Sequence, residues 1–189
     1  MCDFILLKRT VRIRLYPARF RGRLMIRWLA RLVRVSGILI AGVASAEDDP
    51  EFLSFRGGAF DINDSETTAM FGVEYRSDYK DLILTPMAGG FITAEGGLYG
   101  YGGVFLDVFL GRRLVARPSF AVGAYSDGDG KDLGGVLEFR SAIALAWRFD
   151  DRSRLGLEVS HLSNASLYDS NPGTENLTLN YSVPLDRLF

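Results

Sequence analysis

The chain has 189 residues, 48% of them hydrophobic, which is ordinary for one folded domain and unlike a disordered segment. Its net charge of −1 hides an uneven distribution, because residues 1–46 hold ten basic residues and one acidic residue, whereas residues 47–189 hold 12 basic and 22 acidic residues. This acidic remainder excludes nucleic acid as a partner, since phosphate binding requires clustered positive charge.

Residues 1–46 have the pattern of a secretory signal peptide with an extended basic leader. Arginines continue up to Arg34, an apolar run follows to Val43, and the sequence ASA at 44–46 forms a cleavage site before an acidic start. We expect cleavage after residue 46 and a true translation start at Met25, with a mitochondrial transit peptide as the competing interpretation. The single cysteine, Cys2, lies in this leader, so the predicted mature domain has no disulfide.

Residues 47–189 predict an all-β domain. No stretch there holds 18 consecutive apolar residues, which excludes a membrane-spanning helix. Apolar and polar residues instead alternate with a period of two, most clearly over 134–149, where large apolar side chains share one face and small or charged ones share the other. We expect eight strands, near residues 51–60, 66–77, 81–94, 96–110, 113–125, 134–149, 153–164 and 175–185.

The strand lengths and connections predict an eight-stranded antiparallel transmembrane β-barrel of the outer-membrane type. Tilted strands of roughly 9 to 11 residues cross a bilayer, and eight strands form a small barrel with an interior filled by side chains. The turns after the second, fourth and sixth strands are short and charged, whereas the other connections are longer, except around Glu95. Long loops then lie outside the cell and both termini in the periplasm. A soluble periplasmic barrel of the lipocalin kind is the alternative.

Aromatic residues near the predicted strand ends are typical of the girdles at a membrane interface. These residues are Tyr75, Tyr79, Tyr99, Tyr101, Trp147, Phe149, Tyr168 and Phe189.

The stretch HLSNASLYDSNPGTEN at 161–176 contains the only histidine of the chain. Steps of two place His161 and Ser163 on the apolar, lipid-facing side of one strand and Glu175 on the same side of the next. A serine needs a base to take its proton, and a carboxylate on the second imidazole nitrogen fixes the tautomer of that base. Asn164 is the candidate donor to an oxyanion. An interfacial histidine among ordinary loop residues is the alternative interpretation.

Two further loops carry polar residues. Asn171-Pro172-Gly173 predicts a turn that returns Glu175 to the histidine. Asp127, Asp129 and Asp132 could bind calcium, but the stretch lacks the twelfth-position glutamate of an EF-hand loop, which favours a solvated turn. We expect no metal and no other cofactor.

The segments HLSNA at 161–165 and NPG at 171–173, with Glu175, resemble the signature of the PagL family of lipid A 3-O-deacylases. The resemblance implies hydrolysis of the ester-linked 3-hydroxyacyl chain at position 3 of lipid A, with Ser163 as nucleophile, His161 as base and Glu175 as orienting acid. It also implies that Asn164 and Asn171 lie near the oxyanion and that Phe139 helps to form an acyl groove. Leu162 and Ser166 depart from the family pattern, which has an aromatic residue and a glycine there, so acyl preference and loop geometry are open.

The resemblance implies a bacterial outer-membrane location, with the active site at the extracellular rim and with lipid A, or lipopolysaccharide, and membrane lipids as partners. A homodimer is left open. The alternatives are a non-catalytic barrel with a structural or adhesive role and an enzyme that transfers acyl chains between lipids. Because lipid A is phosphorylated, an acidic mature domain would repel it. Divalent cations that bridge the negative charges, or basic residues such as Lys131, are the candidates to offset this repulsion.

Overall fold

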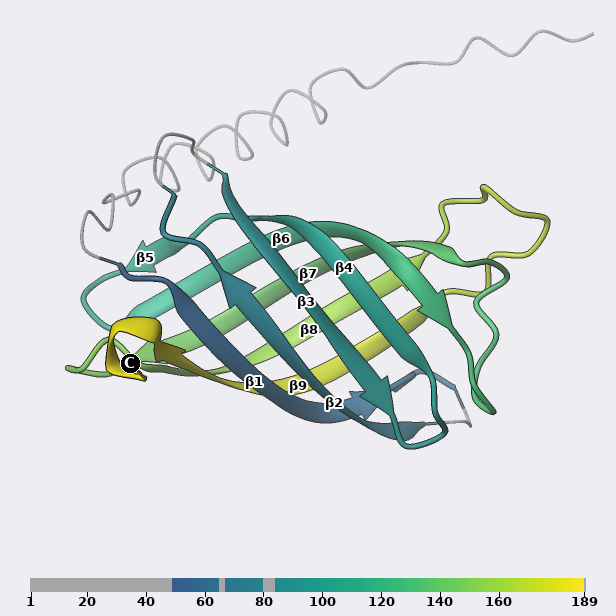
Figure 1. Cartoon of the computed structure of the whole chain (residues 1–189), viewed down its shortest axis with the longest axis horizontal. Coiled ribbons are helices and arrows are strands. Elements are labelled where there is room, and N and C mark those ends of the chain that lie inside the picture. Colours follow the sequence, from purple (N-terminus) through teal and green to yellow (C-terminus); the bar gives the residue numbers. More distant parts are fainter. Residues whose placement is uncertain (1–48, 65–66, 80–83, 189) are drawn as a thin grey trace, which may run out of the picture. The chain divides into compact units, whose positions relative to one another are not determined.

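The structure, a computed structural model, describes residues 49–64, 67–79 and 84–188, which form nine strands and one short 3-10 helix (Figure 1). Within these residues, no helix has the length and hydrophobicity needed to cross a membrane. The predicted signal peptide at 1–46 and Phe189 lie outside the described residues. The elements are β1 (Phe52–Phe60), β2 (Thr68–Arg76), β3 (Thr85–Thr93), β4 (Leu98–Phe105), β5 (Val108–Leu110), β6 (Leu114–Ser126), β7 (Leu137–Arg148), β8 (Arg154–Ser163), β9 (Thr174–Pro184) and η1 (Leu185–Arg187).

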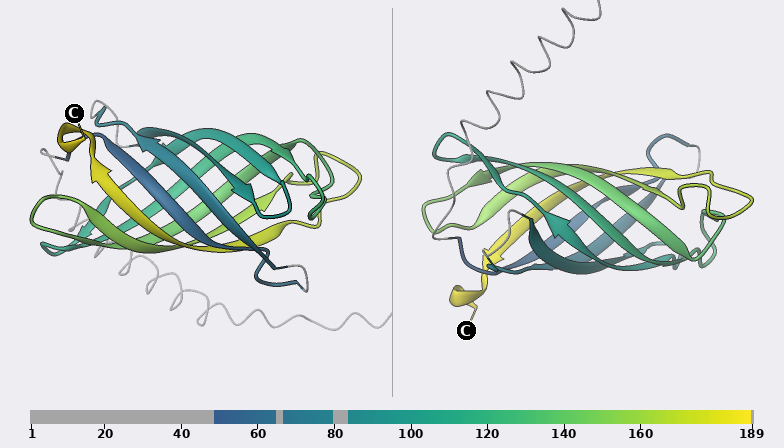
Figure 2. Two further views of the ribbon diagram at one scale, coloured as in Figure 1. Left: turned by 60° about the horizontal axis from the view of Figure 1, so that its bottom comes forward. Right: turned by 90° about the horizontal axis from the view of Figure 1, so that it is seen from above.

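The strands form one antiparallel sheet that closes on itself. Consecutive strands pair except for β4 and β5, which both pair with β6, and the β1–β9 and β4–β6 pairings close the sheet of the described strands into a ring. Figures 1 and 2 show the strands tilted around a common axis. The predicted fold, a closed eight-stranded antiparallel barrel, is therefore confirmed.

The nine strands occupy eight positions because one predicted strand is interrupted. The strand expected over 96–110 is divided at Leu106 and Asp107 into β4 and β5, and both parts pair with β6 in the same register. Pro118 of β6 lies opposite the interruption and has no N–H for the ladder, although its carbonyl still accepts from the Leu106 N–H at 3.1 Å.

The connections separate the barrel into two ends. We call the end that carries loops 61–67, 94–97, 127–136 and 164–173 the loop end. The opposite end carries the connections before β3, β6 and β8 together with η1, as Figure 1 shows. The two ten-residue loops lie at the loop end, as the sequence predicts, and the short 94–97 turn remains the exception.

The period of two separates an apolar outside from a polar inside. In β7, β8 and β9, outward residues such as Ile143, Leu157 and Leu179 are 51–56% exposed, which is the pattern of a wall that faces lipid. The inward residues between them are buried and polar, for example Glu158 at 4% and Asn176 at 0% exposure. Both faces therefore agree with the alternation in the sequence.

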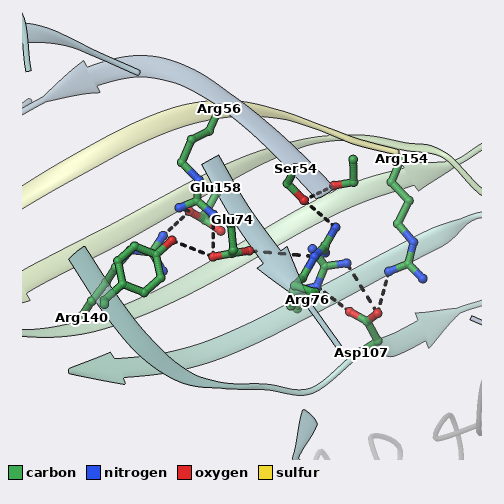
Figure 3. A network of polar contacts seen from close by, with 11 residues as sticks. Ser54, Arg56, Glu74, Arg76, Asp107, Arg140, Arg154 and Glu158 are labelled. Carbon is green, nitrogen blue, oxygen red and sulfur yellow. Dashed lines mark hydrogen bonds and ion pairs between the residues drawn. The ribbon is translucent and has the colours of Figure 1, made fainter. Parts of the chain in front are cut away.

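Ion pairs fill the inside of the barrel away from the loop end (Figure 3). Arg56 lies 2.6 Å from Glu74 and 3.2 Å from Glu158, and Arg140 also pairs with Glu158. Nearer the opposite end, Asp107 accepts from Arg117 at 2.6 Å and from Arg154 at 2.6 Å. Because each of these arginines lies beside a carboxylate, this part of the interior can be polar without leaving isolated ions.

The prediction that Tyr99 and Tyr101 belong to the aromatic girdle at the membrane interface was wrong. Both side chains point into the barrel, where they are 2% and 6% exposed and stack on each other with ring centroids 5.2 Å apart. Their neighbour Leu98 faces outward at 54% exposure, so alternation along β4 turns both tyrosines inward. Trp147, Phe149 and the other described aromatics of that set are exposed on the outside.

Gly58 lies where β1 and β9 approach closely at the seam that closes the barrel. A Cβ at this position would lie 2.0 Å from the Leu177 carbonyl oxygen and 2.7 Å from the Thr178 Cα. We expect Gly58→Ala to destabilise the barrel by about 1–3 kcal/mol, as overpacking does. The urea midpoint of unfolding from lipid vesicles, followed by heat-sensitive migration on gels, measures this loss. Gly102→Ala is the matched control, because nothing lies within 4 Å of its Cβ; equal midpoints would contradict the expectation.

Candidate active site

His161 and Glu175 meet on the outside of the barrel at the loop end. They lie directly opposite each other in the pairing of β8 with β9, and His161 Nδ1 is 3.0 Å from Glu175 Oε1. Their side chains are 48% and 37% exposed, so the pair is accessible from outside. In the tautomer that carries its proton on Nδ1, the imidazole donates to this carboxylate and has Nε2 as an acceptor.

Ser163 lies two residues after His161, at the end of β8, and shares its outer face. It is partly exposed, and its Oγ has no hydrogen bond in the described part of the chain. The structure thus pairs the predicted base with the predicted orienting acid and places the predicted nucleophile beside them with a free hydroxyl. The contact from Ser163 to His161 is not formed in this structure, and such contacts often tighten only when substrate binds.

Asn164 holds the loop that follows Ser163 through its hydrogen bonds. It is fully buried, and its Nδ2 donates to the carbonyls of Leu133 and Ser170 at 2.9 and 2.8 Å. Its backbone N–H donates to Asn171 Oδ1 at 3.0 Å, and its Oδ1 accepts from the Ser166 N–H. All the donors of Asn164 are therefore occupied in this arrangement, which fits a supporting role and leaves none for an oxyanion.

Two other donors near Ser163 are unoccupied. Asn171 is exposed, and its amide N–H₂ has no acceptor among the described residues, although its oxygen is used by Asn164. The Ala165 N–H likewise has no acceptor in the part of the chain that the structure describes. Ala165 and Ser166 both have positive φ, at 52° and 62°, a conformation that is uncommon outside glycine. The sequence reasoning missed Ala165, because only the loop conformation reveals its free N–H.

Gly173 is a second residue of the site that the sequence analysis treated only as part of a turn. Its φ is +65°, and a Cβ there would lie 3.1 Å from His161 Cε1 and 3.7 Å from Nε2. The NPG turn therefore passes directly over the imidazole, and a residue without a side chain is needed for that approach.

Phe139 lies next to Ser163 on the outer wall. The two residues are opposite each other in the pairing of β7 with β8, and Phe139 stacks on Phe120 with ring centroids 6.0 Å apart. Phe120 and Val122 are 51% and 42% exposed, so an apolar wall continues from Ser163 across β7 and β6. This placement is compatible with the predicted acyl-binding role of Phe139 but does not test it.

Loop 127–136 packs against loop 164–173. Besides the contact from Leu133 to Asn164, the Leu137 N–H donates to Tyr168 Oη at 3.2 Å. Asp132, one of the three candidate calcium ligands, accepts instead from the Gly134 N–H at 2.7 Å. Among the described residues, no group of three or more His, Cys, Asp or Glu side chains is arranged to hold a metal ion. A cleft of about 540 Å³ beside this loop, lined by residues such as Leu98 and Val136, contains none of the predicted catalytic residues.

The loop end is acidic. Its loops carry exposed carboxylates at Asp64, Glu95, Asp127, Asp129, Asp132 and Asp169. The one basic residue of its described loops, Lys131, lies 2.7 Å from Asp61 Oδ1 and 3.5 Å from Asp64 Oδ2. Burial alone would lower the pKa of Lys131, but the hydrogen bond and charge of Asp61, with help from Asp64, raise it above its ordinary value. Lys131 is therefore charged at neutral pH and already paired.

Known proteins resemble the chain in sequence and in fold. A family model described as lipid A 3-O-deacylase (PagL) matches residues 19–184. The lipid A deacylase PagL of Bordetella bronchiseptica is 28% identical over 78 residues, which span 41% of this chain and only 39% of that relative. The crystal structure of the outer membrane enzyme PagL covers 70% of this chain and 99% of its own, with a TM-score of 0.58 and 23% identity. At this identity the structural likeness shows a shared fold.

Proposed function

The chain belongs to the PagL family of lipid A 3-O-deacylases, and from this membership we propose that it hydrolyses the ester-linked 3-hydroxyacyl chain at position 3 of lipid A. The general class of activity is carboxylic ester hydrolysis, and the family is one of outer-membrane enzymes. The observation that supports the proposal most strongly is the 3.0 Å contact between His161 and Glu175 on the outer wall, two residues from the free hydroxyl of Ser163.

In the proposed reaction, Ser163 Oγ attacks the ester carbonyl while His161 Nε2 takes its proton. Glu175 holds the imidazole through Nδ1–H and stabilises the imidazolium that forms. The tetrahedral intermediate collapses as His161 returns the proton to the departing sugar oxygen. Water then attacks the acyl-enzyme through the same base and releases a free 3-hydroxy fatty acid, which regenerates Ser163.

The negative charge on the intermediate requires donors close to Ser163. We assign this role to the Ala165 N–H and to the Asn171 amide, which have no acceptor among the described residues, while Asn164 holds the loop in place. One donor of this kind typically contributes about 100- to 1000-fold to the rate. The positive φ of Ala165 and Ser166 is an uncommon backbone conformation directly after Ser163 and Asn164, which is compatible with this role.

The position of the site suits a substrate that stays in the membrane. Long loops of small outer-membrane barrels lie outside the cell, so we place the loop end at the extracellular rim. Lipid A occupies the outer leaflet, with its acyl chains beside the barrel wall and its ester groups near the headgroup boundary. The apolar wall of Phe139, Phe120 and Val122 would contact an acyl chain while the ester reaches Ser163, without extraction into a cavity.

Mass spectrometry of lipid A tests the proposal. Lipid A from cells that express the protein is compared with lipid A from cells that lack it, and free fatty acids are analysed in parallel. We expect loss of one 3-hydroxyacyl chain from position 3 and an equal amount of free 3-hydroxy fatty acid. An unchanged lipid A would favour a structural or adhesive barrel, and a newly acylated acceptor without free acid would indicate a transferase.

Gly173 provides a test of the loop geometry. We expect Gly173→Ala to reduce kcat/KM for fatty acid release by about 10-fold or more, because the methyl group crowds the imidazole and the positive φ costs about 1–2 kcal/mol for an L-residue. Gly111→Ala is the matched control: it has φ +84° at the opposite end of the barrel, with nothing within 4 Å. Equal activity of the two variants would show that the turn does not constrain His161.

A further inference from the structure

Lys131 is the one basic residue in the described loops of the loop end, so it is the obvious candidate to bind a phosphate of the substrate. Its surroundings indicate a different role. Its side chain is only 15% exposed, and its Nζ lies 2.7 Å from Asp61 Oδ1, whose side chain is 1% exposed. A phosphate that used Lys131 would have to compete with this buried carboxylate, which would then be left without its cation.

Asp61 connects Lys131 to the first residue of β9. The same Oδ1 atom accepts a hydrogen bond from Thr174 Oγ1 at 3.0 Å, and the Asp61 N–H donates to Asn176 Oδ1 at 3.1 Å. Thr174 and Asn176 are fully buried. Asp61 also has a positive φ of 60°, so the backbone is held in an uncommon conformation at this junction.

Glu175 lies between these two anchored residues. Because side chains alternate along a strand, Thr174 and Asn176 point into the barrel while Glu175 points out toward His161. The Glu175 carbonyl also accepts from the Ile62 N–H, next to Asp61, at 2.8 Å. Asp61 thus holds β9 from inside the barrel at the position where the Glu175 carboxylate projects outward.

The loop that carries Lys131 also holds the other side of the site. Two residues after Lys131, the buried Leu133 accepts from Asn164 Nδ2 at 2.9 Å, and Asn164 follows Ser163 directly. The short segment 131–133 therefore contacts Asp61, which binds the residues on either side of Glu175, and Asn164, which follows Ser163.

We propose that Lys131 and Asp61 are positioning residues, and that their ion pair fixes the start of β9 so that Glu175 stays aligned with His161. This inference rests on the proposed function for its kinetic consequence. Lys131 acts through Asp61 and Thr174 and makes no contact with the substrate.

Kinetics of fatty acid release from lipid A in vesicles provide the first test, with the variants Lys131→Met and Lys131→Arg. We expect Lys131→Met to lower kcat by about 10- to 100-fold with little change in KM, since small misplacements of reacting groups have effects of this size. Lys131→Arg keeps the ion pair and retains most of the activity. In a Glu175→Ala background, Lys131→Met adds little further loss, because both changes act on the same step.

Lys131→Met leaves Asp61 buried without a cation, so the barrel can fail to fold. The double variant Asp61→Asn with Lys131→Met removes both charges and avoids this problem; we expect the same loss of kcat from it. Asp129→Asn, an exposed residue of the same loop, is the control that should leave kcat unchanged. Heat-sensitive migration on gels reports the folded fraction of each variant.

The single histidine of the chain gives a second readout that does not depend on activity. In tag-free protein labelled with ¹⁵N-histidine, the imidazole signals report the hydrogen bond to Glu175. We expect Lys131→Met and the double variant to shift these signals in the direction of Glu175→Ala, and Lys131→Arg to keep them in place.

Three results would overturn the inference: an unchanged kcat in the folded double variant, unchanged imidazole signals, or a rise in KM for phosphorylated but not for dephosphorylated lipid A. The last result would make Lys131 a phosphate contact. If the unmodified protein releases no fatty acid, the proposed function fails instead, and the imidazole signals still decide whether Lys131 positions Glu175.

Discussion

Ser163→Ala is expected to abolish release of 3-hydroxy fatty acid from lipopolysaccharide while the barrel still folds. The hydroxyl is the only protein group that bonds covalently to the acyl carbon in the proposed mechanism, and loss of a serine nucleophile typically lowers kcat by about 10⁴- to 10⁶-fold. Ser163 is partly exposed at the end of β8, and its Oγ makes no hydrogen bond within the described residues, so its removal should cost little stability.

The measurement is fatty acid release by purified protein in lipopolysaccharide vesicles, with folding checked by heat-sensitive migration. Ser126→Ala is the matched control, since Ser126 is an exposed serine at the loop end of β6. His161→Ala should be as inactive as Ser163→Ala, and the double variant should be no worse, because the two residues act as one unit. Full activity of either single variant would refute the assignment.

Glu175→Ala should lower kcat less than Ser163→Ala or His161→Ala does, because an orienting carboxylate contributes less to the rate than the base that it holds.

The 3.0 Å contact between Glu175 and His161 is the part of the candidate site that could be predicted from the sequence. Alternation from Leu157 to His161 and from Leu179 back to Glu175 puts both side chains on the outer face, and a hairpin of two neighbouring strands then places them opposite each other.

The same periodicity could have placed Tyr99 and Tyr101 correctly. Both lie one residue from outward positions of β4, such as Leu98, and therefore point inward. Their assignment to the membrane girdle relied on residue type and position along the strand, and alternation has priority over residue type because it is set by the backbone. The interruption at Leu106 and Asp107 was harder to predict, because Pro118, which lies opposite it, is on the partner strand and not near it in the sequence.

Loop contacts between distant segments were beyond sequence reasoning. Asp61 and Lys131 are 70 residues apart, and nothing in either loop sequence indicates that they pair. Asn164 looked like an oxyanion donor because it follows the predicted nucleophile, but its donors are taken by Leu133, Ser170 and Asn171. The pattern of the strands fixes which face a residue occupies, whereas the loop conformations decide which donors stay free.

Glu158→Ala is expected to be among the most destabilising single changes in the barrel. Glu158 is 4% exposed, and one of its oxygens accepts from Arg56 at 3.2 Å and also pairs with Arg140, as Figure 3 shows. Removing it leaves Arg140 without an ion-pair partner among the described residues and leaves Arg56 dependent on Glu74 alone. Breaking a buried pair from one side typically costs about 3–5 kcal/mol, because the remaining charge stays desolvated.

The urea midpoint of unfolding from lipid vesicles measures this cost, with Asp150→Ala as the matched control. Asp150 lies 2.7 Å from Arg113, but the two side chains are 90% and 43% exposed, so this pair should contribute less than about 1 kcal/mol. Equal midpoints for the two variants would mean that water reaches the interior arginines. A large difference would mean that the ion pairs of β1, β2, β7 and β8 hold the strands together from inside, which leaves the outer wall available for the proposed catalytic residues.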